Sequence, residues 1–301
     1  MRTLAPDELL TDRPRPGVAR LTINRPARRN AQDTALIVGI DAALVAAGQD
    51  PDVKVIVVAA AGPHFSGGHD LKEPDIYAAT EARTVRAAWV DDTGQGIEPQ
   101  MAREKDLYLE TCERWRNLPK PTIAQVQGLC VAGGLMLAWP CDLIVAAEDA
   151  VFVDNTVGLG VNGHEFFVHH LEVGVRKAKE MLFTGDGVDA HEALRRGMVN
   201  HVVPNAGLEA FTLDLAGRIA QRPTFALKLA KLALNAAQDA AGRRETLTTS
   251  FALHQLAHSH NMLTHDCLVD PSGLGPTLSQ IDVEQIRGRR GHPSPWATDE
   301  A

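Results

Sequence analysis

The chain has 301 residues, and hydrophobic residues make up 45% of it, which is enough for one sizeable α/β core with a helical extension. A formal net charge of -8 argues against a general binder of nucleic acid or of anionic membranes. No continuous apolar run approaches the ~18–20 residues of a membrane span, so we expect a soluble, cytoplasmic protein. The four cysteines have no CxxC spacing, which favours free thiols over disulfides.

The first predicted elements form a βαβ unit. Residues 18–24 alternate as in a strand, residues 34–49 have a helical pattern, and residues 53–60 are nearly all apolar. An apolar run of this kind is typical of a strand that is buried on both faces of a parallel sheet. A right-handed crossover is expected, and repetition of the unit predicts the core.

Further strands are predicted at residues 122–126 and 143–147, and helices dominate the second half of the chain. The helical patterns cover residues 176–184, 190–196, 208–222, 224–240 and 244–262. We expect a core over residues 1–204, a helical region over 205–265 and a proline-rich tail over 266–301.

Two glycine-rich turns follow two of the predicted buried strands. The first turn reads FSGGHD and ends at Asp70, and the second contains Gly128, Gly133 and Gly134. Glycine permits positive φ and a close approach of a ligand to the main chain. Two such turns can direct two backbone N–H groups at one oxygen, and one such donor to an oxyanion is worth about 10²–10³ in rate.

These stretches resemble a known family. FSGGHDLKE, GLCVAGGLMLAWPCD and the earlier LTINRPARRNA are similar to the signature stretches of the crotonase superfamily, the enoyl-CoA hydratases and isomerases, and FTGDGVDAHEALRRGMVNHVVP extends the resemblance. It covers roughly residues 15–265. The resemblance implies an α/β crotonase spiral of repeated ββα units, with a helical C-terminal region that forms trimers or hexamers.

The resemblance also implies a binding site for an acyl-CoA thioester. The N–H groups of His69 and Gly133 would hold the thioester oxygen, and coenzyme A would be part of the substrate, with no separate cofactor. At least one of Arg25, Arg28 and Arg29 would contact CoA, and Lys72 either holds a phosphate or is simply solvated. The other expected substrate contacts are Ser66, Gly67, Gly68, Asp70, Leu71, Gly134, Met136 and Thr156. The interval 74–116 is longer than usual for the family, and it forms either a lid over the acyl group or a surface elaboration.

The sequence departs from the family at the two positions that carry catalytic glutamates, which are Met136 and Thr156 here. Hydration needs one group that accepts a proton from water and one that protonates the α-carbon, and neither residue can do this near neutral pH. Glu165 could serve, since burial would raise its pKa. Asp154, predicted on the same strand face as Thr156, and the His69 imidazole are the other candidates. A structural role is the alternative for each, and Glu165 could cap a helix that begins after Gly163.

Three functions fit these observations. Reversible hydration of a 2-enoyl-CoA is the main prediction. Decarboxylation of a malonyl-type CoA is the second, because loss of CO₂ creates an enolate without proton abstraction. The third is an acyl-CoA binder without catalysis.

No metal site is predicted. His164 and His169 are five residues apart, which places them on different faces of a helix. His254 and His258 share a helix face but have no carboxylate at helical spacing. The glycine loop of residues 158–163 matches GxGxxG but lacks the following βαβ unit of a dinucleotide site.

Overall fold

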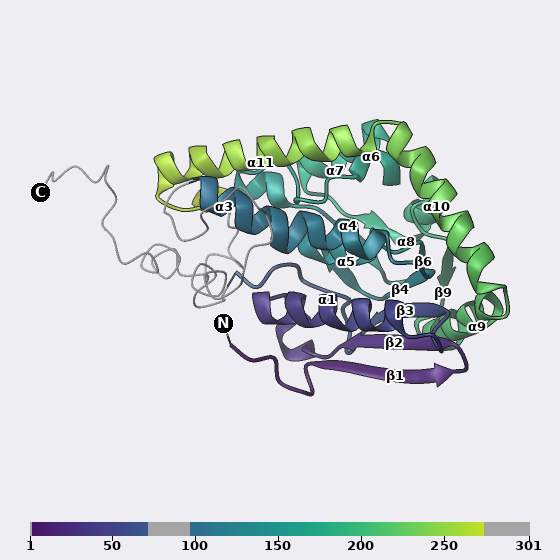
Figure 1. The fold of residues 1–301 in the computed structure, drawn as a ribbon. Coiled ribbons are helices and arrows are strands. Elements are labelled where there is room, and N and C mark those ends of the chain that lie inside the picture. The colour runs from purple at the N-terminus through teal and green to yellow at the C-terminus, as the bar shows by residue number, and fades with distance from the viewer. Residues whose placement is uncertain (1, 72–96, 274–301) are drawn as a thin grey trace, which may run out of the picture.

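The computed structural model describes residues 2–71 and 97–273, in which two sheets are wrapped by helices (Figure 1). The larger sheet has the order β1-β2-β3-β4-β6-β9, and the smaller sheet has the order β5-β7-β8. In the larger sheet only the β1–β2 pair is antiparallel. The strands are β1 (Leu9–Arg15), β2 (Val18–Ile23), β3 (Val55–Ala60), β4 (Thr122–Val126), β5 (Leu129–Val131), β6 (Leu143–Ala147), β7 (Val151–Val153), β8 (Val188–Asp189) and β9 (His201–Val203).

Strand β3 shows why the sheet is covered on both faces. All six of its residues are buried, and alternate side chains enter two separate apolar clusters. Ile56 and Val58 join the cluster on the side of α1 (Thr34–Gln49), whereas Val55 and Val57 pack toward α9 (Leu208–Ala220). The predicted βαβ unit is confirmed, since β2 and β3 are parallel and α1 connects them.

Strand β1 was not predicted from the sequence. Its segment LLTDRPR is mostly exposed and contains Pro14, so it shows no apolar alternation. A proline is tolerated there because an edge strand has one row of N–H groups that needs no partner.

The C-terminal helices lie within three residues of their predicted bounds. They are α7 (Val175–Thr184), α8 (Ala190–Arg196), α9, α10 (Thr224–Ala240) and α11 (Arg243–His265), whereas the short helix α6 (His169–Glu172) was not predicted. A short 3-10 turn, Pro271–Gly273, follows. Residues 274–301 of the expected tail lie outside the described residues.

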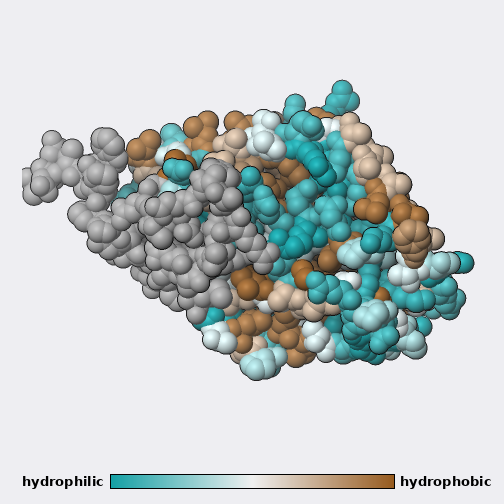
Figure 2. Space-filling view, in the orientation of Figure 1, coloured by the Kyte–Doolittle hydropathy of each residue, from teal (hydrophilic) through white to brown (hydrophobic). Residues whose placement is uncertain are grey.

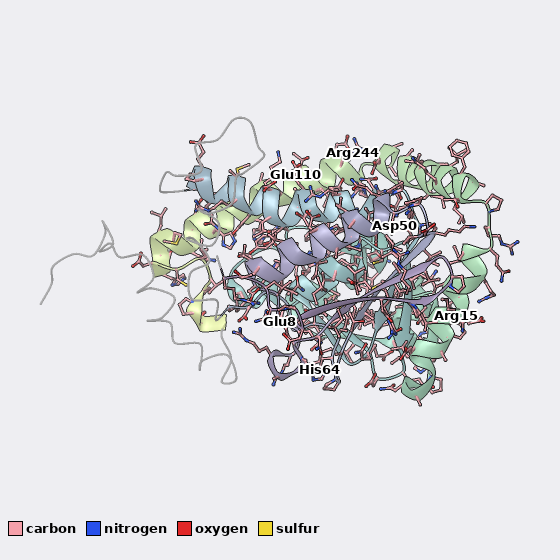
Figure 3. The ribbon with its side chains drawn as sticks, turned by 60° about the horizontal axis from the view of Figure 1, so that its bottom comes forward. Glu8, Arg15, Asp50, His64, Glu110 and Arg244 are labelled. Carbon is pink, nitrogen blue, oxygen red and sulfur yellow. The ribbon has the colours of Figure 1, made fainter. Side chains whose placement is uncertain are left out.

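Helix α11 runs alongside the continuous helical segment made of α3 (Ile97–Glu104), a π-helix (Lys105–Leu109) and α4 (Glu110–Arg116) (Figure 1). Arg243 of α11, whose side chain is 1% exposed, links α11 to two other helices. Its Nη1 is 2.5 Å from Oε1 of Glu113 on α4, and its Nε is 2.7 Å from Oδ1 of Asp239 on α10. Figure 3 shows the labelled Glu110 and Arg244 on this helical side, with Glu8 and His64 on the opposite side. Buried charge pairs therefore fasten the C-terminal helices to the core.

All four cysteines are free thiols, as predicted. Burial raises the pKa of Cys141 to about 12. Within residues 2–71 and 97–273, no helix combines the length and apolar character that a membrane crossing requires.

Candidate active site

The two glycine turns meet, and the backbone amides of His69 and Gly133 border one space. The Gln32 amide donates to Gly68 O and the Asp70 amide donates to Gln32 O, each at 2.8 Å. Because backbone groups alternate in an extended segment, the intervening His69 N–H points away from Gln32. Gly133 lies at the start of a 3-10 turn, where an amide has no intrahelical acceptor. A Cβ at Gly133 would lie 3.0 Å from His69 N, so the two amides are neighbours.

Two buried polar side chains, Gln32 and Ser66, connect the two glycine turns by hydrogen bonds. The Gln32 side-chain amide donates to Gly133 O at 2.8 Å and to Ser66 Oγ at 3.0 Å. Ser66 Oγ donates to Asn30 O at 2.9 Å and accepts from Gly68 N at 3.2 Å. The hydroxyl predicted to contact substrate is therefore engaged within the protein. Gln32 was missed in the sequence, because its partners are distant in the chain.

Glycine is required where the two turns approach closely. Gly68 has φ of +92°, and a Cβ there would lie 2.8 Å from Val131 O. A Cβ at Gly134 would lie 2.8 Å from Ser66 O. The amide of Gly67 donates to Arg29 O at 2.8 Å. The predicted glycine residues thus shape the turns, and their backbone lets the two loops touch.

The His69 imidazole and the Glu165 carboxylate lie together next to these amides. Their Nε2 and Oε2 atoms are 3.7 Å apart, and the side chains are 19% and 7% exposed. Among the described residues neither ring nitrogen of His69 has a hydrogen-bond partner. Of the three groups proposed for proton transfer, the structure therefore brings two together next to the amides.

Tyr108 completes this group of side chains. Its ring stacks on the His69 imidazole with centroids 4.4 Å apart, and it lies in the π-helix Lys105–Leu109. Such π-helical turns are rare and frequently occur at functional sites. The sequence offered no signal for Tyr108, because a π-helix has no pattern of its own. Its place supports the expectation that part of the interval 74–116 walls the pocket.

Two expectations for Glu165 are wrong. Burial does raise its pKa, but the interactions with His69 and the charge of His254 outweigh burial and hold that pKa below the usual value. Helix α6 begins only at His169, so Glu165 lies in a loop and does not cap a helix. The carboxylate is therefore ionised and faces two imidazoles.

The prediction that Asp154 shares a strand face with Thr156 is also wrong. Strand β7 ends at Val153, and Thr156 begins a 3-10 turn. Asp154 Oδ1 accepts from Thr156 N at 2.9 Å and from Thr156 Oγ1 at 2.6 Å, while Oδ2 lies 2.7 Å from His169 Nε2. Asp154 is fully buried, and both of its oxygens are engaged. Its arrangement suits a structural ion pair better than a base for water.

The two histidines next to Asp154 were expected on different faces of one helix. His164 instead precedes α6, and the rings of His164 and His169 lie 4.6 Å apart. Burial, together with the charge of His169, lowers the pKa of His164 to about 3. His164 is thus neutral in the working range of pH.

Asp154→Asn is expected to destabilise the protein by about 3–5 kcal/mol at neutral pH, because it removes one partner of a buried ion pair. Burial raises the pKa of Asp154, but the hydrogen bond and charge of His169 lower it further than burial raises it. The stabilisation that the ionised Asp154 carboxylate provides is therefore fully present above its unfolded-state pKa of 3.8. It is lost as the pH falls through the lower pKa that Asp154 has in the folded protein.

Urea unfolding across a pH series measures this effect. The wild type should lose more stability than Asp154→Asn as the solution becomes acidic, and the exposed Asp186→Asn serves as the matched control. Equal stability of Asp154→Asn and the wild type at neutral pH would contradict the ion-pair assignment.

Residues 13–265 match the family model described as enoyl-CoA hydratase/isomerase. The chain belongs to this family. It is 44% identical over 248 residues to the Mycobacterium tuberculosis protein EchA13, named as an enoyl-CoA hydratase, with 81% of this chain and 78% of that protein covered.

Solved structures agree. A probable enoyl-CoA hydratase from Mycobacterium thermoresistibile has a TM-score of 0.76 at 44% identity, covering 85% of this chain and 98% of that one. An enoyl-CoA hydratase/isomerase from Xanthobacter autotrophicus Py2 has a TM-score of 0.74 at 32% identity, covering 94% and 95%. The predicted crotonase fold is confirmed.

In this family member, the two positions expected to carry glutamates contribute no carboxylate. Met136 lies in α5 (Leu135–Ala138), is 3% exposed and belongs to the main apolar cluster. Thr156 donates its hydroxyl hydrogen to Asp154. The Glu165 carboxylate, by contrast, lies 3.7 Å from the His69 imidazole.

The arginines expected near CoA differ in exposure. Arg25 is buried, and its guanidinium lies 2.9 Å from Asp33, 3.1 Å from Glu8 and 3.5 Å from Asp70. Arg28 is 47% exposed, with Nη2 2.8 Å from Asp70 Oδ2. Arg28 can therefore reach a solvated anion, whereas Arg25 and Asp70 fix the loop. Leu71 is half-buried, its amide donating to His69 O, and Lys72 lies outside the described residues.

A further prediction is corrected on α11. His254 and His258 do face a carboxylate, because Glu104 of α3 lies 3.5 Å from His258 Nε2. It belongs to another helix, which is why helical spacing could not reveal it.

Proposed function

We propose that this protein catalyses the reversible hydration of a 2-enoyl-CoA, with His69 and Glu165 in place of the family's two glutamates. One observation carries the proposal. The amides of His69 and Gly133 border the same space as an imidazole and a carboxylate that lie 3.7 Å apart. Thioester polarisation and proton transfer are thereby available at one place.

The amides would hold the thioester oxygen and stabilise the negative charge that it gains in the enolate. Glu165 accepts a proton from water, and the hydroxide oxygen forms its bond to the β-carbon. The protonated His69 then gives its proton to the α-carbon, which converts the enolate into the 3-hydroxyacyl thioester. Glu165 returns its proton to His69, so the pair regains its starting state and one water has been added.

Decarboxylation of a malonyl-type CoA is less well supported. Glu165 is buried and ionised beside the proposed thioester position. A substrate carboxylate placed near it would be repelled, and such repulsion is strong where water is excluded. The same residue that assists hydration therefore disfavours the second reaction.

Incubation with crotonyl-CoA and methylmalonyl-CoA side by side tests this proposal. We expect loss of the conjugated enoyl thioester absorbance and formation of a 3-hydroxyacyl-CoA, with no CO₂ from the second substrate. Release of CO₂ without hydration would establish the decarboxylase instead. Affinity for both esters without turnover would establish a binding protein.

We also propose that the C-terminal helices form a trimer, or a hexamer made of two trimers. Exposed large apolar side chains gather along α10 and α11, and Figure 2 shows brown surface along these helices. They are Phe225, Leu229, Leu232, Leu234, Leu253, Leu256 and Leu263. Exposed apolar side chains that gather along neighbouring helices mark an interaction surface.

Light scattering should therefore give three or six times the chain mass of 32.5 kDa. Leu229→Asp and Leu232→Asp together should reduce the mass, since two charges would be buried in the interface. Ala206→Asp adds a charge at an exposed position outside α10 and α11, so this control should leave the mass unchanged. A wild-type monomer would contradict the assembly.

A further inference from the structure

A second cluster of titratable side chains lies beside the candidate active site. Glu104 ends α3, and His254 and His258 lie one turn apart on α11. The three residues are buried, at 7%, 4% and 6% exposure. One possible ligand atom from each lies within 4.8 Å of the others. Two helices that are far apart in the sequence thus bring two imidazoles and a carboxylate together.

The protons on both imidazoles can be placed from their backbone contacts. His254 Nδ1 is 2.8 Å from Gly163 O, and His258 Nδ1 is 2.7 Å from Leu268 O. A carbonyl oxygen only accepts, so each Nδ1 carries hydrogen and donates it. In the neutral rings each Nε2 therefore keeps a lone pair. Histidines that bind metals are oriented in the same way, with the second nitrogen donating to a carbonyl or carboxylate.

The carboxylate is oriented as well. Glu104 Oε2 accepts from Gln255 Nε2 at 2.5 Å, and Oε1 accepts from the Gln100 side-chain amide. Carboxylates that bind metals are likewise hydrogen-bonded by their surroundings. All three possible ligands thus have the outer hydrogen bonds that a metal site needs.

The separation between His258 and Glu104 fits a shared ion better than a hydrogen bond. His258 Nε2 lies 3.5 Å from Glu104 Oε1, beyond the usual hydrogen-bond length. Two ligands of a tetrahedral ion with bonds of ~2.0–2.1 Å are about 3.3–3.4 Å apart. On the other side, His254 Nε2 lies 3.8 Å from Glu165 Oε1, so a second carboxylate can balance the charge of a divalent cation.

We propose that Glu104, His254 and His258 bind a divalent first-row transition metal ion such as Zn²⁺. Two imidazoles and one carboxylate suit such ions and leave a position for water. The ion ties α3 to α11 and so steadies the π-helix that follows α3 and carries Tyr108. The described cluster of Asp154, His164 and His169 carries no such proposal, because Nδ1 of both imidazoles lacks an outer partner.

Isothermal titration of the chelator-treated full chain with Zn²⁺ tests the site, and visible absorption after addition of Co²⁺ reports its coordination. His258→Gln and Glu104→Gln each remove one ligand. His260→Gln is the control, because His260 is exposed on the same helix. We expect one ion per chain in the wild type and in His260→Gln, with affinity at least ~100-fold weaker in both ligand variants.

Circular dichroism and the Tm of each metal-free variant establish that it is folded. Zn²⁺ should raise the Tm of the wild type and of His260→Gln but not of His258→Gln. Should a ligand variant fail to fold, Gln255→Leu replaces it, with an expected ~10–100-fold loss of affinity from the missing hydrogen bond to Glu104.

Absence of saturable binding by the wild type would overturn the proposal. Equal affinity in the wild type and in a folded ligand variant, or in Gln255→Leu, would overturn it too, since the binding would then be adventitious. No acyl-CoA is present in these measurements, so the result is independent of the proposed hydration.

Discussion

Glu165→Gln is expected to lower kcat for 2-enoyl-CoA hydration by about 10²–10⁴-fold, the usual contribution of a positioned acid–base group. The amide has nearly the shape of the carboxylate, but it cannot accept a proton from water. KM should change little, because the amides of His69 and Gly133 still hold the thioester. Steady-state kinetics on crotonyl-CoA measures both constants.

Glu110→Gln is the matched control, because this glutamate side chain is 55% exposed on α4 and pairs with Lys105. Its kcat should equal that of the wild type. A fully active Glu165→Gln enzyme would exclude this carboxylate as the base. A folded enzyme that loses substrate affinity but keeps kcat would instead assign Glu165 to binding.

Local patterns predicted much of the fold. Helix α1 has a helical pattern and the expected bounds, and the apolar run of residues 53–60 contains β3, which begins two residues later than expected and ends at the expected residue. The glycine turns were recognisable because few other residues permit their contacts, as the position of Gly68 shows. Such features depend on neighbours in the chain, and the sequence displays them directly.

The side-chain chemistry of the site was harder to predict, because it depends on contacts between distant segments. Glu165 lies next to His69, but the sequence argument for its pKa was wrong, because the interactions with His69 and His254 outweigh burial. The position of Asp154 was predicted wrongly because β7 ends at Val153, so the alternation of side chains along a strand applies to neither Asp154 nor Thr156. Tyr108 reaches His69 from a segment with no recognisable period. No local pattern in the amino-acid sequence predicts these contacts between distant segments.

Gly133→Ala is expected to lower kcat/KM for hydration by about 10²–10³-fold, the effect of losing one oxyanion donor. The added Cβ would lie 3.0 Å from both His69 N and the His69 imidazole Cε1. A methyl group there occupies the space in which a thioester oxygen must meet the two amides. Gly133 does not have positive φ, so alanine can adopt its backbone conformation and the protein should fold.

Gly207→Ala is the control, since a Cβ at that position has no described atom within 4 Å. Its kinetics should match the wild type, and circular dichroism should show both variants folded. Gly133→Ala keeps the Glu165 carboxylate, but its Cβ also borders the His69 imidazole, so the loss of rate reports on the two amides and on the position of that ring together. Full turnover by a folded Gly133→Ala enzyme would mean that the thioester oxygen binds elsewhere, and the hydration mechanism would then lack its electrostatic support.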